Sequence, residues 1–144
     1  MIEQIVHNNK LLAIIIYSSY SEPGINFLTP ENFSQQLAFM KHPQGKEIFP
    51  HVHNSVAREV HFTKEVLVIR KGRLRVDFYT DQQEYIESRI LSKEDVILLS
   101  EGGHGFKVLE ELEMIEIKQG PYAGDKDKTR FTGVSIENIK IKNE

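Results

Sequence analysis

The sequence predicts an all-β domain, and three observations support this fold class. Residues 5–119 form short runs rich in β-branched and aromatic residues, separated by Gly, Pro, Asn and Asp. No stretch keeps a helical period of apolar residues for ten positions or more. Apolar and polar residues alternate through residues 73–78, as they do in a half-buried strand. Short, regularly spaced strands of this kind suit a sandwich or a closed barrel.

The N-terminal part of the chain contains four expected strands. Residues 5–20 predict a hairpin that turns at Asn8 and Asn9, because adjacent asparagines suit a tight turn between two strands. Residues 24–28 predict a short strand closed by Pro30. Residues 33–43 predict a further strand, which leads into the extended segment GKEIFPHVH at residues 45–53.

The second half of the chain is expected to begin with a half-buried hairpin over residues 65–91, turned at Lys71 and Gly72. Alternation places a set of apolar residues on its core face: Leu67, Ile69, Leu74, Val76 and Phe78. The opposite face is expected to meet solvent or a dimer partner, and it carries Arg75, Asp77 and Tyr79. Two more strands are expected around Gly102 and Gly103, and residues 120–144 read as a polar loop and tail.

Composition excludes several classes of protein. The chain has 144 residues, 40% of them hydrophobic, which suits one globular domain. The net charge of −3 and the scattered Lys and Arg residues argue against nucleic acid as a partner. The apolar run over residues 11–16 is too short to span a membrane, and the start lacks a basic signal-peptide region, so we expect a cytoplasmic protein. The absence of cysteine restricts any metal site to nitrogen and oxygen ligands.

Two histidines one residue apart, His51 and His53, are the first candidate site residues. In an extended strand they share one face, so their imidazoles can converge on one ion. Gly45 stands six residues before His51, and Glu65 stands seven residues before Gly72 at the start of an apolar run. A His-x-His pair alone often arises by chance, and these flanking spacings strengthen the interpretation of the pair as metal ligands.

This pattern resembles the first motif of the cupin superfamily, in which Gly, His-x-His, Glu and Gly follow one another at set distances. The later run EDVILLSEGGHGF offers His104 in the place of the histidine of the second cupin motif. The resemblance covers about residues 36–119 and implies a double-stranded β-helix, or jelly-roll, barrel. It differs from the family at residues 54–64, where eleven residues separate His53 from Glu65 instead of three or four.

The resemblance implies a metal site made by His51, His53, Glu65 and His104. Three imidazoles and one carboxylate suit a divalent transition metal such as Fe, Mn, Zn or Ni, and they leave positions open for water or substrate. Alternation sends Glu65 inward with Leu67, although Glu59 is a rival for the carboxylate ligand. No catalytic residue is identified beyond the ligands, and the insertion supplies two candidates, Arg58 and His61.

The expected function is that of a metal-dependent enzyme on a small polar molecule, an oxygenase or an isomerase or epimerase. The expected substrate is a sugar or a carboxylate, because the cupins that this chain resembles include sugar isomerases and small cupins of carbohydrate pathways. The alternative is a non-catalytic module that uses its metal to bind or sense a ligand. We also expect a homodimer, in which the apolar run over residues 11–16 pairs or packs across a two-fold axis.

Overall fold

The computed structural model describes residues 1–144, and its regular structure is almost entirely antiparallel β-strand. The predicted all-β class is therefore confirmed. None of the helices has the length and hydropathy needed to cross a bilayer. The elements in chain order are β1 (Ile2–His7), β2 (Lys10–Ile16), β3 (Gly24–Phe27), β4 (Ala38–Lys41), β5 (Glu65–Lys71), β6 (Leu74–Tyr79), β7 (Tyr85–Leu91), β8 (Val96–Leu99), β9 (Gly103–Val108), β10 (Glu113–Lys118) and the 3-10 turns η1 (Gly124–Asp127) and η2 (Ile136–Asn138).

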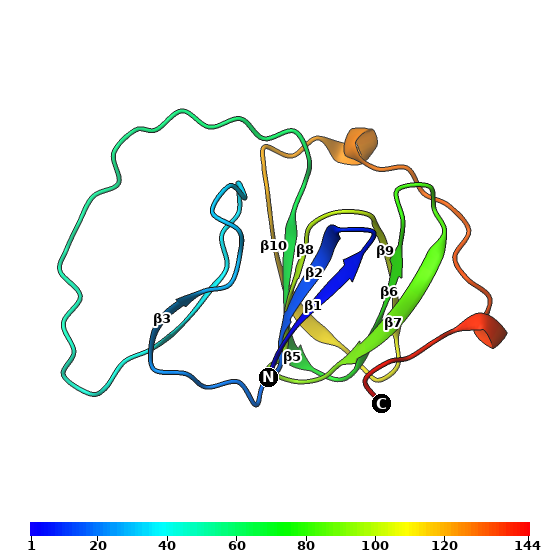
Figure 1. The fold of residues 1–144 in the computed structure, drawn as a ribbon, viewed down its shortest axis with the longest axis horizontal. Helices are drawn as coiled ribbons and strands as arrows, with labels where there is room; N and C mark the ends of the chain where they lie inside the picture. The colour runs from blue at the N-terminus through cyan, green and yellow to red at the C-terminus, as the bar shows by residue number, and fades with distance from the viewer. The chain divides into compact units, whose positions relative to one another are not determined.

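The chain forms two compact units, which we describe separately. The main unit contains Met1–Tyr20 and Thr63–Glu144, and the hairpin unit contains Ser21–Phe62. The main unit has a five-stranded sheet of order β1-β2-β8-β5-β10 and a three-stranded sheet of order β7-β6-β9 (Figure 1). Buried apolar side chains of both sheets make one shared core: Ile5, Leu12, Ala13, Ile15, Leu67, Ile69, Leu74, Val76, Phe78, Leu91, Ile97 and Leu99. We call the face of each strand that meets this core its inward face.

The N-terminal hairpin has the predicted turn. Asn8 and Asn9 both adopt positive φ, at 47° and 60°, which matches the tight turn that right-twisted strands prefer. β2 pairs with β1 on one side and with β8 on the other. Both edges of β2 are therefore occupied within the chain, which leaves packing as the way residues 11–16 would take part in a dimer; the dimer itself stays a prediction.

The chain crosses from one sheet to the other between β5 and β6. β5 pairs with β8 and β10, whereas β6 pairs with β7 and β9, so the predicted hairpin of these two strands is wrong. The predicted core residues are nevertheless buried, because alternation along a strand is the same in either pairing. Gly72 makes the crossing at a φ of +83°, and a Cβ there would lie 2.1 Å from the Glu111 carbonyl oxygen. Only glycine fits this position.

The outward face of β6 is covered by the C-terminal segment, which corrects the prediction that it meets solvent or a dimer partner. Tyr79 is buried, and its ring packs edge-on against Phe131 with centroids 5.0 Å apart. Asp77 is also buried, where it receives two hydrogen bonds from Arg75, at 2.8 and 3.0 Å, and one from Ser88. A sequence pattern of alternating polarity cannot reveal that a distant segment covers the polar face.

The last residues of the chain extend the edge of the three-stranded sheet. Ser88 and Ile141 form a parallel bridge, and Ser88 N donates to Lys140 O at 2.8 Å. The side chain of Asn143 accepts a hydrogen bond from Ile90 N and donates to Ile90 O, both at 2.8 Å. The segment expected to be a loop and tail is therefore in part an ordered edge of β7.

The hairpin unit contains one two-stranded sheet. β3 and β4 pair antiparallel, and they lie where short strands were predicted. Residues 42–62 contain no strand, and the segment with His51 and His53 is irregular (Figure 1). The prediction that these histidines lie in an extended strand is thus not met in the single chain.

Candidate functional site

Glu65 lies at the start of β5 on its inward face. Its neighbours on that face, Leu67 and Ile69, belong to the buried core, and Glu65 itself is only 7% exposed. This confirms the prediction that alternation turns the carboxylate inward. A buried carboxylate is costly unless it has a partner, so its surroundings decide what it does.

His104 supplies that partner from the other sheet. It lies on β9 opposite Phe78, and residues opposite each other in an antiparallel pair share a face. His104 Nε2 is 3.1 Å from Glu65 Oε2. The structure therefore brings together two of the four predicted ligands, although 39 residues separate them.

The pair is arranged so that Glu65 is ionised near neutral pH. The hydrogen bond from His104 lowers the pKa of the Glu65 carboxyl, and this effect outweighs the opposing effect of burial. The positive charges of Lys128 and Lys118 also lower it. Because an ionised carboxylate only accepts hydrogen bonds, Nε2 of His104 carries the shared proton and Nδ1 is the imidazole nitrogen left for other partners.

Two ionisable residues of β10 also lie on an inward face, and the sequence analysis did not identify them as site residues. Lys118 lies opposite Glu65, and Glu116 lies opposite Leu67. Lys118 Nζ is 3.5 Å from Glu116 Oε1. In the run EMIEIK the apolar Ile115 and Ile117 look like the inward residues, so only the register against β5 reveals the true orientation.

The inward side chains of β9 and β10 beyond the ionisable groups are apolar and partly exposed. Phe106 is 40% exposed, Val108 52% and Met114 39%, in contrast to the fully buried inward residues of β5. Each of these two strands has a hydrogen-bonded neighbour on one side only. The Phe106 ring lies 5.4 Å from the His104 ring, centroid to centroid. An aromatic surface therefore stands beside the imidazole.

His51 and His53 form a second pair, in the hairpin unit. Their ring centroids are 5.2 Å apart in an edge-to-face arrangement, and both residues are exposed. His51 Nδ1 is 3.0 Å from the Phe49 carbonyl oxygen, which favours a proton on Nδ1 and leaves Nε2 free. Two imidazoles are thus close to each other, as the His-x-His spacing predicts.

The two catalytic candidates of the insertion lie in the same unit and are exposed. His61 Nε2 is 3.6 Å from Glu59 Oε2, so Glu59 pairs with this histidine and not with Arg58. Arg58 Nη1 is 3.5 Å from the Val56 carbonyl oxygen, within its own segment. Neither Arg58 nor His61 contacts a further ionisable group in that unit. Glu65, unlike its rival Glu59, is the buried carboxylate.

Taken unit by unit, the donors are of the chemical type that a transition metal binds, but each unit brings only two of the predicted ligands together. Imidazole nitrogen and carboxylate oxygen are suitable ligands for Fe, Mn, Zn or Ni. Inside each unit, no group of three or more His, Cys, Asp or Glu side chains is placed to hold an ion. Within the main unit the predicted ligands Glu65 and His104 form one pair, and within the hairpin unit His51 and His53 form another.

Comparisons with known proteins identify no relative, so any functional argument rests on the residues of this chain. No family model matches the chain, and no significant match was found among curated proteins or among solved structures.

Proposed function

We propose that this protein is a metal-dependent cupin that acts as an enzyme on a small polar molecule. The observation that carries the proposal is the contact between Glu65 and His104. Two ligands predicted from separate motifs meet on the inward faces of different sheets, at 3.1 Å. Glu65 is buried and His104 is half-buried, and a chance pair of surface residues would have no reason to meet in this way at both motif positions.

In the proposed site the metal is held by His104 and Glu65 together with His51 and His53, within a jelly-roll architecture. A divalent ion in such a ligand set supplies Lewis acidity toward a bound oxygen atom, or oxygen chemistry if it is iron. The ionised state of Glu65 suits metal binding, because a ligating carboxylate must be deprotonated.

Residues of this chain beside the pair favour an enzyme over a ligand-binding module. Lys118 and Glu116 lie on the inward face next to Glu65, and both can transfer a proton to or from a substrate. The exposed ring of Phe106 offers a surface on which the apolar face of a sugar can pack. We therefore propose a sugar or a related carboxylate as substrate of an isomerase, epimerase or oxygenase, in a cytoplasmic homodimer.

Elemental analysis tests the metal. Protein purified without added metal is expected to contain a transition metal, and His104→Ala or Glu65→Gln is expected to lose most of it. His7→Ala and His42→Ala are matched controls and should keep the wild-type content. A wild-type protein that binds no transition metal would exclude the proposed site.

Turnover tests the activity. The iron, manganese and zinc forms are incubated with sugars, sugar phosphates and small carboxylates, and product formation in any form supports an enzyme. Lys118→Ala is expected to lower kcat with little change in metal content, because an ammonium group can donate a proton to a substrate but is not one of the proposed metal ligands. Tight binding of a ligand without product in every form would instead support the binding module.

A further inference from the structure

The strand that carries His104 has a bare outward face at this position. β9 reads Gly-His-Gly over residues 103–105, and alternation turns both glycines outward because His104 is inward. Gly103 lies opposite Tyr79 of β6, which is also an outward residue. On the side of β9 away from the imidazole, other side chains can therefore lie directly against the backbone.

Two aromatic residues occupy this bare face. A Cβ added at Gly103 would lie 3.3 Å from Tyr79 Cβ, and one at Gly105 would lie 3.7 Å from Tyr79 Cε2. The ring of Phe131 packs edge-on against the Tyr79 ring, and its Cζ would lie 3.3 Å from the same Cβ at Gly103. We call Tyr79 and Phe131 the aromatic clamp.

The C-terminal segment holds the clamp together. Phe131 comes from the stretch between η1 and η2 (Figure 1). Three residues further on, Val134 N donates a hydrogen bond to the Tyr79 hydroxyl at 3.1 Å. A Cβ at Gly133 would lie 3.2 Å from that hydroxyl oxygen, so the backbone of the segment runs close over it. Tyr79 is thus gripped at its ring and at its hydroxyl by one short piece of chain.

The same segment is attached to the start of β5. Thr63, two residues before Glu65, donates a hydrogen bond from Oγ1 to Asp127 Oδ2 at 2.8 Å. β5 belongs to the five-stranded sheet, whereas β9 belongs to the three-stranded sheet. Residues 127–134 therefore join the two sheets close to Glu65 at one end and directly behind His104 at the other.

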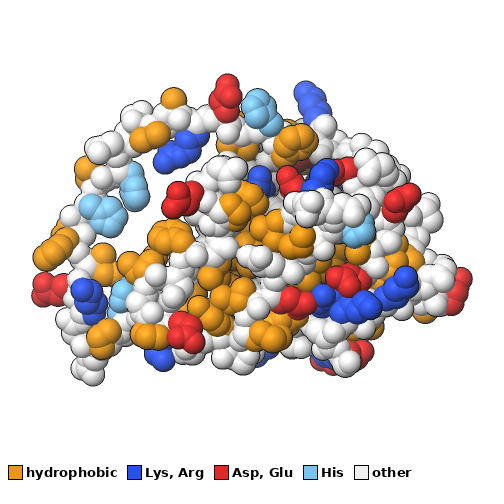
Figure 2. All heavy atoms as spheres, viewed as in Figure 1, with side chains coloured by type: hydrophobic (Ala, Val, Ile, Leu, Met, Phe, Trp, Pro, Cys, Tyr) orange, Lys and Arg blue, Asp and Glu red, His pale blue; other side chains and the backbone are white.

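We propose that the aromatic clamp positions His104 against Glu65, and that the C-terminal segment thereby sets the geometry of the site. The clamp matters to function only if this pair belongs to the site, so its role rests on the proposed function. Acidic and basic side chains are interspersed on the face of the main unit that Figure 2 shows, so no charge of one sign orients the pair from that face. Packing against the backbone does so instead, since a site works only when its groups are held within about 0.5 Å. Phe131 lies on the outward side of β9 and is a positioning residue, not a ligand.

Phe131→Ala tests the clamp in protein without metal. The proton on His104 Nε2 is hydrogen-bonded to Glu65 and is therefore protected from exchange with water. Without the Phe131 ring this proton should exchange about tenfold faster, as measured by NMR of the imidazole N–H, with His104→Gln identifying the signal by its absence. Asn143→Ala is the control, because it loosens the other end of the same segment at Ile90 and should leave the exchange unchanged. An equal rise in Asn143→Ala would overturn the clamp.

Two glycine variants give a second, independent test. Gly103 and Gly105 flank His104 and neither has positive φ, so the backbone accepts alanine at both positions. Gly103→Ala places a methyl group 3.3 Å from atoms of both clamp residues, which must move apart. Gly105→Ala makes an ordinary contact of 3.7 Å with one of them. The imidazole proton should exchange several-fold faster in Gly103→Ala and at the wild-type rate in Gly105→Ala, and this pair decides the question if Phe131→Ala does not fold.

Cobalt(II) binding connects the clamp to function. Phe131→Ala should bind cobalt about tenfold more weakly than the wild type while its circular dichroism stays the same, because groups that orient a ligand typically contribute this much to affinity. Unchanged proton exchange or unchanged cobalt affinity in both Phe131→Ala and Gly103→Ala would overturn the clamp and leave the proposed function standing. Wild-type protein that binds no cobalt, iron, manganese or zinc would instead overturn the proposed function, and proton exchange in the metal-free protein would still decide the clamp.

Discussion

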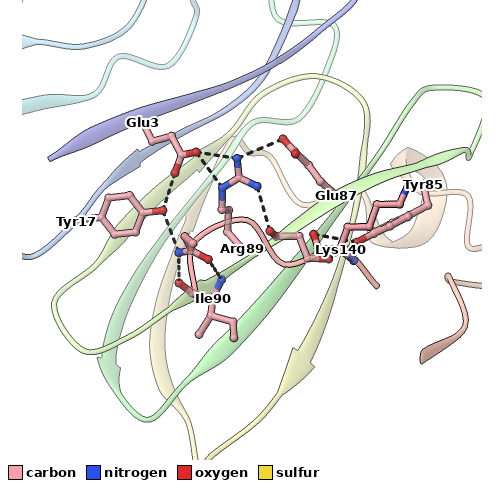
Figure 3. Close-up of polar contacts among 9 residues, drawn as sticks. Glu3, Tyr17, Tyr85, Glu87, Arg89, Ile90 and Lys140 are labelled. Atoms are coloured by element: carbon pink, nitrogen blue, oxygen red, sulfur yellow. Dashed lines mark hydrogen bonds and ion pairs between the residues drawn. The ribbon is translucent and has the colours of Figure 1, made fainter. Parts of the chain in front are cut away.

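Arg89 binds the Glu3 carboxylate through two N–H groups, with Nε and Nη2 lying 2.9 and 2.7 Å from Glu3 Oε1 (Figure 3). Glu3 lies on β1 and Arg89 on β7, so this ion pair joins the five-stranded sheet to the three-stranded sheet. Tyr17 donates a hydrogen bond to the other oxygen of Glu3 at 2.7 Å. Both oxygens of the carboxylate are therefore satisfied.

Arg89→Ala is expected to lower the free energy of unfolding by about 3 kcal/mol, because it leaves two carboxylates without their shared cation. The Arg89 side chain is only 7% exposed and also lies 3.3 Å from Glu87 Oε1. Urea denaturation of the main unit measures the loss. Arg130→Ala is the control, since its 3.0 Å ion pair with Asp125 is exposed to solvent and its loss should leave the free energy of unfolding almost unchanged. Equal losses in the two variants would contradict a structural role of the buried pair.

Glu3→Gln is expected to weaken the acid dependence of stability. Burial raises the pKa of the Glu3 carboxyl, but hydrogen bonds from Arg89 and Tyr17 outweigh it, so the pKa lies below its ordinary value. The resulting stability is fully present above the unfolded pKa of about 4.3 and is lost as the pH falls through the folded pKa. Denaturation curves at stepwise pH below 5 measure the slope. An unchanged slope in Glu3→Gln would refute the assignment.

Asn143→Ala is expected to loosen the C-terminal segment locally. Its side chain makes two hydrogen bonds with the Ile90 backbone and a third with the Tyr17 hydroxyl at 3.0 Å. Because Ile90 N then has no protein acceptor, its amide should exchange with solvent about tenfold faster, equivalent to about 1.4 kcal/mol. Hydrogen exchange followed by NMR measures this. Asn138→Ala, which loses a bond only to the nearby Ser135, should leave Ile90 protected.

Gly72→Ala is expected to destabilise the main unit more than Gly124→Ala. Both glycines have positive φ, but a Cβ at Gly72 meets the Glu111 backbone at 2.1 Å, whereas one at Gly124 meets nothing within 4 Å. The control therefore measures the conformational strain, of about 1 kcal/mol. The clash should add about 2 kcal/mol in Gly72→Ala. Thermal unfolding compares the two variants, and similar melting temperatures would show that the backbone moves aside at no cost.

Local sequence patterns predicted the turns and the core faces of strands well, because these features depend on residues that are neighbours in the sequence. Asn8 and Asn9 mark their turn through backbone preference, and Leu67 to Ile69 and Leu74 to Phe78 mark core faces through alternation. The family resemblance assigned Glu65 and His104 to one metal site; the structure brings these two side chains to within 3.1 Å of each other, and their role as ligands stays a prediction.

Two features could not be predicted in this way: which strands pair with each other, and which strand faces are covered by another segment. Both depend on residues distant in the sequence. A short Lys-Gly turn suggests a hairpin, yet the strands on either side of Gly72 belong to different sheets. The covering of Asp77 and Tyr79 depends on Phe131 and the C-terminal segment, for which local polarity gives no signal. Lys118 was missed for a related reason, because its orientation follows from the β5 register and not from its neighbours.

The order of the five-stranded sheet has a consequence for how quickly the protein folds. In this sheet β2 pairs with β8, and β5 with β10. The strands of each pair are far apart in the sequence, whereas β1 with β2 and β6 with β7 are close hairpins. Joining distant segments requires large loops to close before their contacts are gained, so such topologies fold in roughly milliseconds to seconds. We expect the two hairpins to form early and the β5–β10 ladder to form near the end of refolding. Until that ladder forms, the unpaired edges of β5 and β10 would be the surfaces through which partly folded chains aggregate most readily.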